Sequence, residues 1–457
     1  MPHIPARSRG SLKARAGKSY VIRELVLPVQ AFIYTEGVSG IVLFAATLIA
    51  LVWANSPWSD SYFELWKTYL SIDLGFFKIS ESLLHWINDA LMVIFFFVVG
   101  LEVKRELLHG TLNDRRRAML PLMAGLGGMV MPAAFYFIFN IGGTGEAGWG
   151  IPMATDIAFA LGLLTLLGKR VPMELRIFLL AFAIVDDIGA IIVIALFYTS
   201  DISWNALWIA AGILGVLFGM NRAKVHKTRL YGLVGVLLWL AVFESGLHPT
   251  LAGVLLAMFI PSKSYFSRST YLQSMEILLR QFREALENKQ KNREEAVLGR
   301  IEELSKDTES PLERLEREIH PWASYVVLPV FALANAGIVF TSDALTSAFN
   351  SPVTWGILMG LLVGKPIGIF GFSWLAIRLN LASLPNSVNW GHIFGAGVLA
   401  GIGFTVSLFI SGLSFTDEAM VSQSKMGILI GSLIAGVIGC GTLLMTKRKG
   451  QPSSASG

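Results

Sequence analysis

About twelve apolar segments recur along this 457-residue chain, and several are long enough to cross a lipid bilayer. A straight spanning helix needs roughly 20 apolar residues, and in lipid its backbone must satisfy its own hydrogen bonds. Hydrophobic residues make up 54% of the sequence and charged residues 15%. This balance predicts an all-α polytopic membrane protein rather than a soluble enzyme. The predicted segments are 37–55, 83–103, 118–139, 151–167, 175–198, 204–220, 231–243, 248–260, 322–340, 353–377, 393–413 and 426–445.

Basic residues alternate between the connections of these segments. Lys and Arg collect in every second connection, whereas connections such as 140–149 and 199–203 carry almost none. By the positive-inside rule both termini then face the cytoplasm, and 231–243 and 248–260 are two spans rather than one broken span. The exceptions are Lys67, Lys78 and Lys425. The same placement accounts for the net charge of +5 without a nucleic-acid partner.

Composition divides the chain into five parts. They are an N-terminal cytoplasmic tail 1–35, a membrane region 36–260, a charged cytoplasmic insertion 261–319, a second membrane region 320–446 and a C-terminal cytoplasmic tail 447–457.

The insertion carries a narrow apolar stripe at helical spacing. Its members recur at steps of three and four: Leu272, Met275, Leu279, Phe282 and Leu286. This periodicity predicts a helix. The helix is either a solvated cytoplasmic element or a coiled-coil-like dimer contact or docking surface, and the sequence leaves these alternatives open.

Two adjacent aspartates, Asp186 and Asp187, lie near the centre of segment 175–198. Each costs roughly 2.5–3.5 kcal/mol of insertion free energy at mid-bilayer, so the pair predicts a functional site. Neighbours on an α-helix point about 100° apart, so one can line a cavity while the other reaches a different partner. A complete cation shell therefore needs ligands from other segments.

Segment 151–167 offers such ligands. Pro152 removes a helix donor, and Thr155 and Asp156 follow it. A helix interrupted here frees carbonyl oxygens and leaves Asp156 near mid-membrane. The repeated glycines of segment 393–413 predict a second helix interruption, which matches the one at Pro152. Paired interruptions of this kind mark the substrate site in several transporter families, including the one named below.

Lys365 lies within the apolar segment 353–377. A buried ammonium needs a carboxylate partner, and Asp186 is the candidate. The lysine can serve as an internal ion pair between two helices, as a charge-compensating or proton-carrying group at the site, or as both.

These polar residues predict an oxygen-lined site for a transported alkali cation. Hard cations prefer oxygen ligands, and Na⁺ or Li⁺ would bind at Asp187, Asp186 and Thr155, with Asp156, freed carbonyls and water completing the shell. The same carboxylates hold either the metal ion or protons. A site opened alternately to each side then exchanges one for the other, and no further cofactor is expected.

A weaker set of polar residues flanks this core. Asp89 lies near the start of segment 83–103 and Glu102 near its end; they either line a funnel or cap the segment at the interface. His248 begins segment 248–260 and is either a pH-responsive group or a hydrogen-bonded structural residue.

Nine short strings occur in a fixed order between about residues 36 and 445. They are WINDALM (86–92), VGLEVKRELL (99–108), ATDIAFALG (154–162), AIVDDIGAII (183–192), LHPTLAGV (247–254), HPW (320–322), FALANAG (331–337), GKPIG (364–368) and GIGFT (401–405). Together they resemble the NhaA family of sodium/proton antiporters. Such an ordered set is highly specific, whereas an Asp-Asp pair alone is not.

The resemblance implies twelve transmembrane helices with inverted-topology repeats and two broken helices that cross at mid-membrane. It implies a secondary Na⁺(Li⁺)/H⁺ antiporter of the bacterial inner membrane. Transport would be electrogenic, with more H⁺ entering than Na⁺ leaving, and regulated by pH.

The resemblance also carries residue roles. Asp186 and Asp187 match the family's essential pair, with Asp187 the direct cation ligand, and Asp156 and Thr155 match its broken-helix residues. Lys365 matches the lysine opposite the aspartates. A further group matches positions near the cytoplasmic funnel that are tied to pH response, namely Glu102, Glu316 and His320. The insertion at about 263–309 exceeds the family's usual short connection and lies beside this group.

Two other classes of protein share features with this chain. An intramembrane aspartyl protease also places two aspartates in the bilayer, but its Gly-x-Gly-Asp signature is missing, since Phe404 follows Gly403. A cation channel would pass Na⁺ without moving protons. The sequence therefore predicts a transporter rather than an enzyme. Its expected partners are the bilayer, Na⁺, Li⁺ and H⁺, with a homodimer as a candidate assembly.

Overall fold

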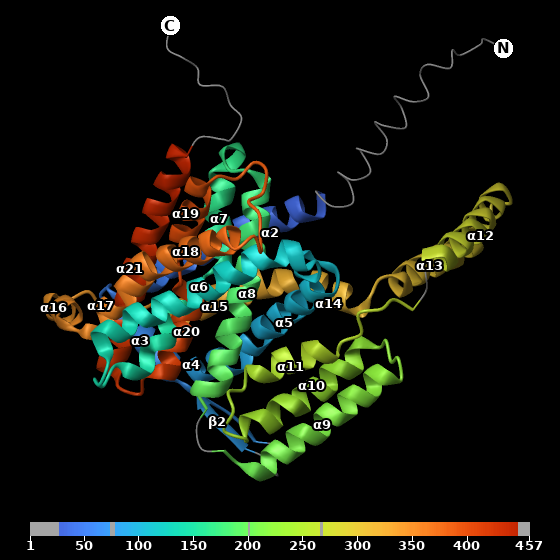
Figure 1. The fold of residues 1–457 in the computed structure, drawn as a ribbon. Helices are drawn as coiled ribbons and strands as arrows, with labels where there is room; N and C mark the ends of the chain where they lie inside the picture. Colours follow the sequence, from blue (N-terminus) through green and yellow to red (C-terminus); the bar gives the residue numbers. More distant parts are fainter. Residues whose placement is uncertain (1–26, 74–77, 200–201, 266–267, 447–457) are drawn as a thin grey trace, which may run out of the picture.

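Most of the chain is helical (Figure 1). The computed structural model describes residues 27–73, 78–199, 202–265 and 268–446, so the predicted tails 1–35 and 447–457 fall largely or wholly outside it. Each of the twelve predicted apolar segments contains helix, which confirms the all-α fold class. The helices are α2 (Leu27–Ala54), α3 (Ser59–Lys67), α4 (Leu83–His85), α5 (Met92–His109), α6 (Arg115–Asn140), α7 (Ile157–Leu166), α8 (Met173–Phe197), α9 (Trp204–Arg222), α10 (Thr228–Phe243), α11 (Leu251–Phe259), α12 (Arg268–Glu287), α13 (Lys291–Thr308), α14 (Pro311–Trp322), α15 (Leu328–Asn335), α16 (Ser342–Asn350), α17 (Pro352–Met359), α18 (Lys365–Arg378), α19 (Trp390–Leu399), α20 (Phe404–Ser414) and α21 (Glu418–Met445).

Shorter elements interrupt or join these helices. Within the described residues, strands β1 (Tyr69–Asp73) and β2 (Lys78–Ser82) pair as an antiparallel hairpin. Tighter 3₁₀ segments are η4 (Thr111–Asn113), η5 (Glu146–Met153) and η6 (Gly168–Arg170), and wider π-helical segments are η3 (Trp86–Leu91), η7 (Ala323–Val327) and η8 (Gly360–Gly364).

Eight helical stretches among the described residues are long and apolar enough to cross a membrane, and the bent pair α19/α20 makes a ninth. The remaining predicted spans contain the shorter helices α10, α11 and α15, of 16, 9 and 8 residues. Large apolar side chains also face outward, among them Trp208, Leu233 and Val437 at 73%, 65% and 67% exposure. An apolar exterior of this kind needs lipid around it, so the chain is an integral membrane protein.

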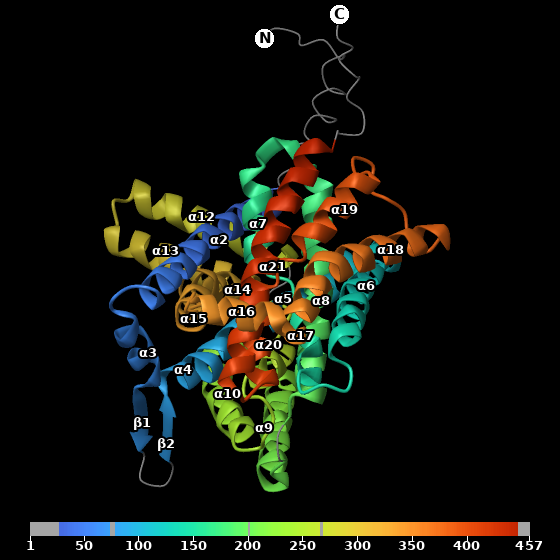
Figure 2. The same cartoon turned by 90° about the vertical axis from the view of Figure 1, so that its left-hand side faces the viewer.

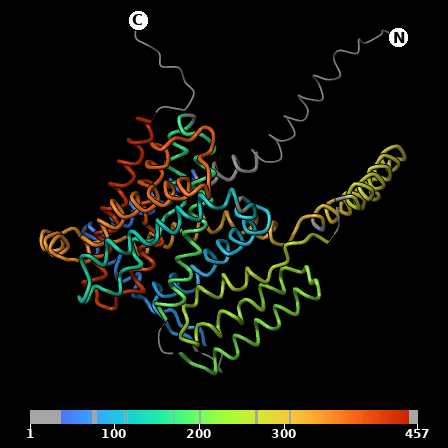
Figure 3. Tube along the Cα trace, viewed as in Figure 1, coloured from blue at the N-terminus to red at the C-terminus, as the bar shows by residue number. Residues whose placement is uncertain are grey.

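Two bodies of helices share the membrane region (Figures 1 and 3). Helices α9, α10 and α11 form a layer on one side, and α11 packs against α5. The larger body holds the main buried core, to which α2, α6, α7, α8, α15 and α17 to α21 contribute. Helix α5 contributes to the buried clusters of both bodies, so it joins them.

The larger body repeats one arrangement. Helices α6 and α8 flank the interrupted element η5/α7, and α17/η8/α18 and α21 flank the interrupted element α19/α20. The backbones of α6 and α18 meet at Gly127 and Gly368, where a methyl group on either glycine would collide with the other's carbonyl oxygen. Small residues allow this close approach, which is typical of packed membrane helices. Along the chain, each interrupted element therefore lies between two longer helical spans.

The charged insertion folds as a helical hairpin of α12 and α13, which projects sideways from the body (Figures 1 and 2). The hairpin has a small core of its own, with Ala285, Val297 and Leu304 buried. Its two ends meet at the body, because the Leu312 amide donates a hydrogen bond to the Pro261 carbonyl. The insertion thus leaves the body and returns to it at one place, directly before α14.

Candidate functional site

Two interrupted helices meet at their breaks. Segment η5 ends at Met153, residues 154–156 are extended, and α7 begins at Ile157, while α19 and α20 are bent by 47° around residues 400–403. The Asp156 amide donates to the Ile402 carbonyl at 2.6 Å, and the Thr155 hydroxyl donates to the Ala400 carbonyl at 3.0 Å. Backbone groups released by each break are therefore partly satisfied by the other, as a lipid-surrounded protein requires.

Asp156 joins the starts of two helices. Its Oδ1 accepts from the Phe159 amide of α7 at 3.0 Å, and its Oδ2 accepts from the Thr405 amide and hydroxyl of α20 at 3.1 and 2.6 Å. Both helices direct their positive N-terminal ends at this carboxylate, which stabilises its charge. Asp156 therefore fixes the crossing and brings an anionic group to its centre.

The crossing requires glycine at position 401. A Cβ there would lie 2.5 Å from the Leu361 carbonyl and 3.0 Å from the Val398 carbonyl. We expect Gly401→Ala to lower the stability by about 1–3 kcal/mol, the usual cost of overpacking, and to reduce transport. Gly412→Ala is the matched control, since nothing lies within 4 Å of its added methyl group. Thermal unfolding of the two purified variants measures the difference, and equal melting temperatures would contradict the tight crossing.

Lys365 and Asp186 form a buried ion pair. Lys365 Nζ lies 2.8 Å from Asp186 Oδ2, and the two residues are 0% and 2% exposed. Nζ also donates to the Met153 carbonyl at the end of η5. The π-helical segment η8 directly precedes Lys365, and such wide turns often occur at functional sites. The pair ties α18, α8 and the first broken helix together.

Asp187 faces a different direction from Asp186, into a cavity of about 40 Å³. Thr155, Asp156, Thr405 and Glu102 line the same cavity. A water needs about 10–15 Å³ of such volume, so the cavity has room for an ion with one or two waters. Carboxylate, hydroxyl and water oxygens are the ligands that hard cations prefer. The cavity can therefore hold one alkali cation beside Asp187.

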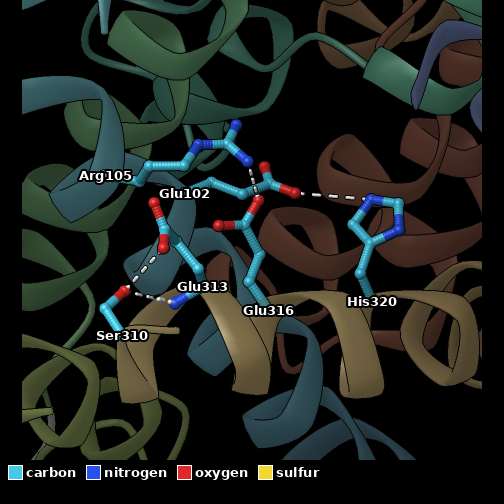
Figure 4. Close-up of polar contacts among 6 residues, drawn as sticks. All are labelled: Glu102, Arg105, Ser310, Glu313, Glu316 and His320. Carbon is cyan, nitrogen blue, oxygen red and sulfur yellow. Dashed lines mark hydrogen bonds and ion pairs between the residues drawn. The ribbon is translucent and has the colours of Figure 1, made fainter. Parts of the chain in front are cut away.

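Two ion pairs join α5 and α14 (Figure 4), and the residues of one of them, Glu102 and His320, line this cavity. Glu102 of α5 lies 3.4 Å from His320 of α14, and Arg105 of α5 pairs with Glu316 of α14. Burial raises the pKa of the Glu316 carboxyl, and the Arg105 guanidinium beside it opposes that shift. Ser310 caps α14 by accepting from the Glu313 amide at 3.2 Å. Helix α14 is thus held against α5 by ionisable side chains.

Two sequence candidates lie elsewhere. Asp89 lines a separate small pocket with His85 and Trp239, and neither it nor His248 lines the cavity at Asp187. The His248 ring packs edge-on against Phe409 of α20, with ring centroids 5.3 Å apart. The other candidates lie at the crossing, at the cavity or in the ion pairs between α5 and α14.

The sequence patterns do not single out Thr405, whose hydroxyl donates to Asp156 and which lines the cavity. Its position two residues after the Gly401-Ile-Gly403 break, at the start of a half-helix, was an available signal. Among the described residues no group of three or more His, Cys, Asp or Glu side chains is arranged to bind a metal ion.

A helical membrane protein whose two broken helices cross beside buried carboxylates has the architecture of a secondary transporter. The family model described as Na+/H+ antiporter 1 matches residues 30–443. The chain therefore belongs to this antiporter family, which confirms the resemblance seen in the sequence.

Curated relatives agree with the family match. A protein of Koribacter versatilis (strain Ellin345) named Na(+)/H(+) antiporter NhaA is 45% identical over 95% of this chain and 94% of its own length. A protein of the same name from Rhodopirellula baltica is 46% identical over 92% of this chain and 94% of its own length. A protein of Syntrophotalea carbinolica, named Na(+)/H(+) antiporter NhaA 2, is 45% identical over 90% of this chain and 95% of its own length.

Proposed function

We propose that this member of the family exports Na⁺ or Li⁺ in exchange for H⁺, by alternating access to one site at the helix crossing. The observation that carries the proposal is the cavity at the crossing, where Asp187 lies with Thr155, Asp156 and Thr405. Asp187 is the direct ligand of the cation, and Thr155 and water supply further oxygens. The expected location is the bacterial inner membrane, with both termini in the cytoplasm.

Competition for one carboxylate couples the two ions. A cation at Asp187 leaves no place for a proton there, and a proton removes the charge that binds the cation. The Asp186–Lys365 pair, next along α8, is the second place where a proton can be taken up or released. Two protons moving against one Na⁺ would make transport electrogenic.

The direct test uses the full chain in proteoliposomes with a preset pH gradient. Adding Na⁺ or Li⁺ should dissipate the gradient, and an electrogenic exchanger should respond to an imposed membrane potential. A cation channel would carry Na⁺ current without moving protons. That result would contradict the proposed exchange.

We further propose that the two ion pairs between α5 and α14 regulate transport by pH. His320 is charged only when protonated, so acid strengthens its attraction to Glu102 at the cavity and holds α14 in place. Loss of that proton weakens the attraction between His320 and Glu102, so that α14 no longer restricts the cavity.

Glu316→Gln should shift the activation profile toward acid pH. The substitution removes the ion pair with Arg105. Less attraction between α5 and α14 then has to be lost by deprotonation of His320 before transport begins. We expect a shift of about 0.5–1 pH unit, because one unit corresponds to about 1.4 kcal/mol. Glu318→Gln is the matched control, on the same helix but exposed. Sodium-driven proton flux against pH measures both, and an unmoved profile for Glu316→Gln would exclude this regulation.

A further inference from the structure

The cavity at Asp187 contains a hydroxyl group that does not come from the helix crossing. Ser324 lines this cavity and is only 4% exposed. It lies in η7, on the continuous helical span formed by α14, η7 and α15, whereas Thr155 and Thr405 belong to the two broken helices. The cavity therefore has a polar group on a wall that the crossing does not supply.

Residues four apart keep one face of this span toward α5 and the cavity. Glu316 and His320 point toward α5 (Figure 4), and Ser324 lines the cavity one turn further along. In a straight α-helix each step of four residues drifts by about 40°. The π-helical turn η7, in which the Leu328 amide donates to the Ala323 carbonyl, advances less per residue and offsets part of this drift. The wide turn therefore keeps Ser324 on the cavity face.

A hydroxyl in this position can serve a cation even when its proton is engaged elsewhere. A serine oxygen has one proton to donate and two lone pairs, so the lone pairs remain available once the proton is donated. The crossing already shows this arrangement, because the Thr155 hydroxyl donates to the Ala400 carbonyl and Thr155 still lines the cavity. Ser324 brings the same chemistry to the other wall.

The size of the cavity makes each protein oxygen important. Its volume of about 40 Å³ leaves room for one or two waters beside an ion, since each water needs roughly 10–15 Å³. Hard cations gather several oxygen ligands, and one carboxylate with one or two waters does not supply enough of them. Most of the shell must then come from protein oxygens that line the cavity.

We propose that the Ser324 hydroxyl is a direct ligand of the transported cation and favours Na⁺ over Li⁺. The inference rests on the proposed exchange at Asp187. Selectivity between two hard cations depends on the size of the cavity and on the number of ligands. Na⁺ is larger than Li⁺ and binds more oxygens, so an additional hydroxyl ligand benefits Na⁺ more.

Kinetics with both ions test the selectivity. Ser324→Ala should raise the KM for Na⁺ about three- to tenfold, the effect of one lost neutral contact, and the KM for Li⁺ less than about twofold. The maximal rate should change little, because Asp187 and its proton remain. Ser324→Thr keeps a hydroxyl and should restore most of the Na⁺ affinity. The matched control is Ser373→Ala, because Ser373 is also buried but does not line the cavity. Proteoliposomes with a preset pH gradient measure all four proteins.

A thiol at the same position tests the geometry by binding rather than by transport. Cys440 is first replaced by serine, since it is the chain's one native cysteine. Ser324→Cys then puts a soft sulfur in the cavity with Asp187, and soft ligands select soft cations such as Cd²⁺. The purified variant should bind Cd²⁺ at least about tenfold more tightly than Ser324→Ala, and Na⁺ should displace it. Any Cd²⁺ bound by Ser373→Cys should be insensitive to Na⁺.

The possible failures are distinguishable. If the intact chain exchanges Na⁺ for H⁺ and Ser324→Ala keeps both KM values, the inference is wrong and the proposed function stands. A lower maximal rate with both KM values unchanged would mean that Ser324 only supports its helix, which also overturns the inference. Absence of exchange in the intact chain would refute the proposed function instead. Competition between Na⁺ and Cd²⁺ in Ser324→Cys would then still decide whether this position shares a site with the cation.

Discussion

Replacing Asp187 by asparagine should reduce sodium-driven proton movement by about a hundredfold or more. The carboxylate is the one member of the α8 pair that faces the cavity, and asparagine supplies neither its charge nor its titrating proton. A hydrogen bond or ligand contact to a charged group contributes about 3 kcal/mol, which corresponds to about two orders of magnitude in affinity. Dissipation of a pH gradient in proteoliposomes, followed over a range of Na⁺ concentrations, measures the loss.

The matched control for that experiment is Glu174→Gln. Glu174 lies on the same helix but is exposed and accepts a hydrogen bond from Ser387, so its loss should leave transport nearly unchanged. Asp187→Glu should retain the proton chemistry with a weakened affinity for the cation, because the carboxylate is moved by one methylene group. Full activity of Asp187→Asn would refute the assignment of the site.

Removing Lys365 alone should destabilise the protein by about 3–5 kcal/mol. Lys365→Met leaves the carboxylate of Asp186 buried without its cationic partner, and an uncompensated buried charge is costly. Asp186→Asn should cost a similar amount, because it leaves the ammonium alone. The double variant Asp186→Asn/Lys365→Met should recover most of the loss. Thermal unfolding in detergent measures the four proteins of this cycle.

The same cycle tests whether the pair carries a transported proton. If it does, the double variant should still exchange Na⁺ for H⁺ but with fewer protons per cation, so an imposed membrane potential should affect it less. Unchanged stoichiometry would leave the pair as a structural tie between α8, α18 and the first broken helix. Additive losses of stability in the double variant would contradict the ion pair itself.

Much of this architecture was predictable from local rules. The apolar segments predicted the helices, and Pro152 and the glycines around 401 predicted the two breaks. The turn of an α-helix required that Asp186 and Asp187 diverge, and the structure places one against Lys365 and the other at the cavity. These features follow from spacing along one segment, which a sequence records directly.

Contacts between distant segments were harder to predict from the sequence. Thr405 directly follows the second break in the sequence, but its bond to Asp156 crosses 249 residues of sequence, and no local pattern specifies which carboxylate it meets. The partner of Arg105 could not be predicted for the same reason, because Glu316 lies on the far side of the insertion in the sequence. The sequence placed Leu272, Leu279 and Leu286 on one stripe of α12, but it did not show that these leucines would stay exposed while Ala285 is buried.

The central claim is that one cavity holds either an alkali cation or protons, and equilibrium binding tests it most directly. Binding of radioactive Na⁺ to the purified protein should be measured between pH 6 and 9. Direct competition predicts that the number of Na⁺ sites stays constant. The apparent Kd for Na⁺ should rise about tenfold for each unit by which the pH is lowered if one proton competes, and about a hundredfold if two compete. A Kd that does not change with pH while the number of sites falls would contradict the account.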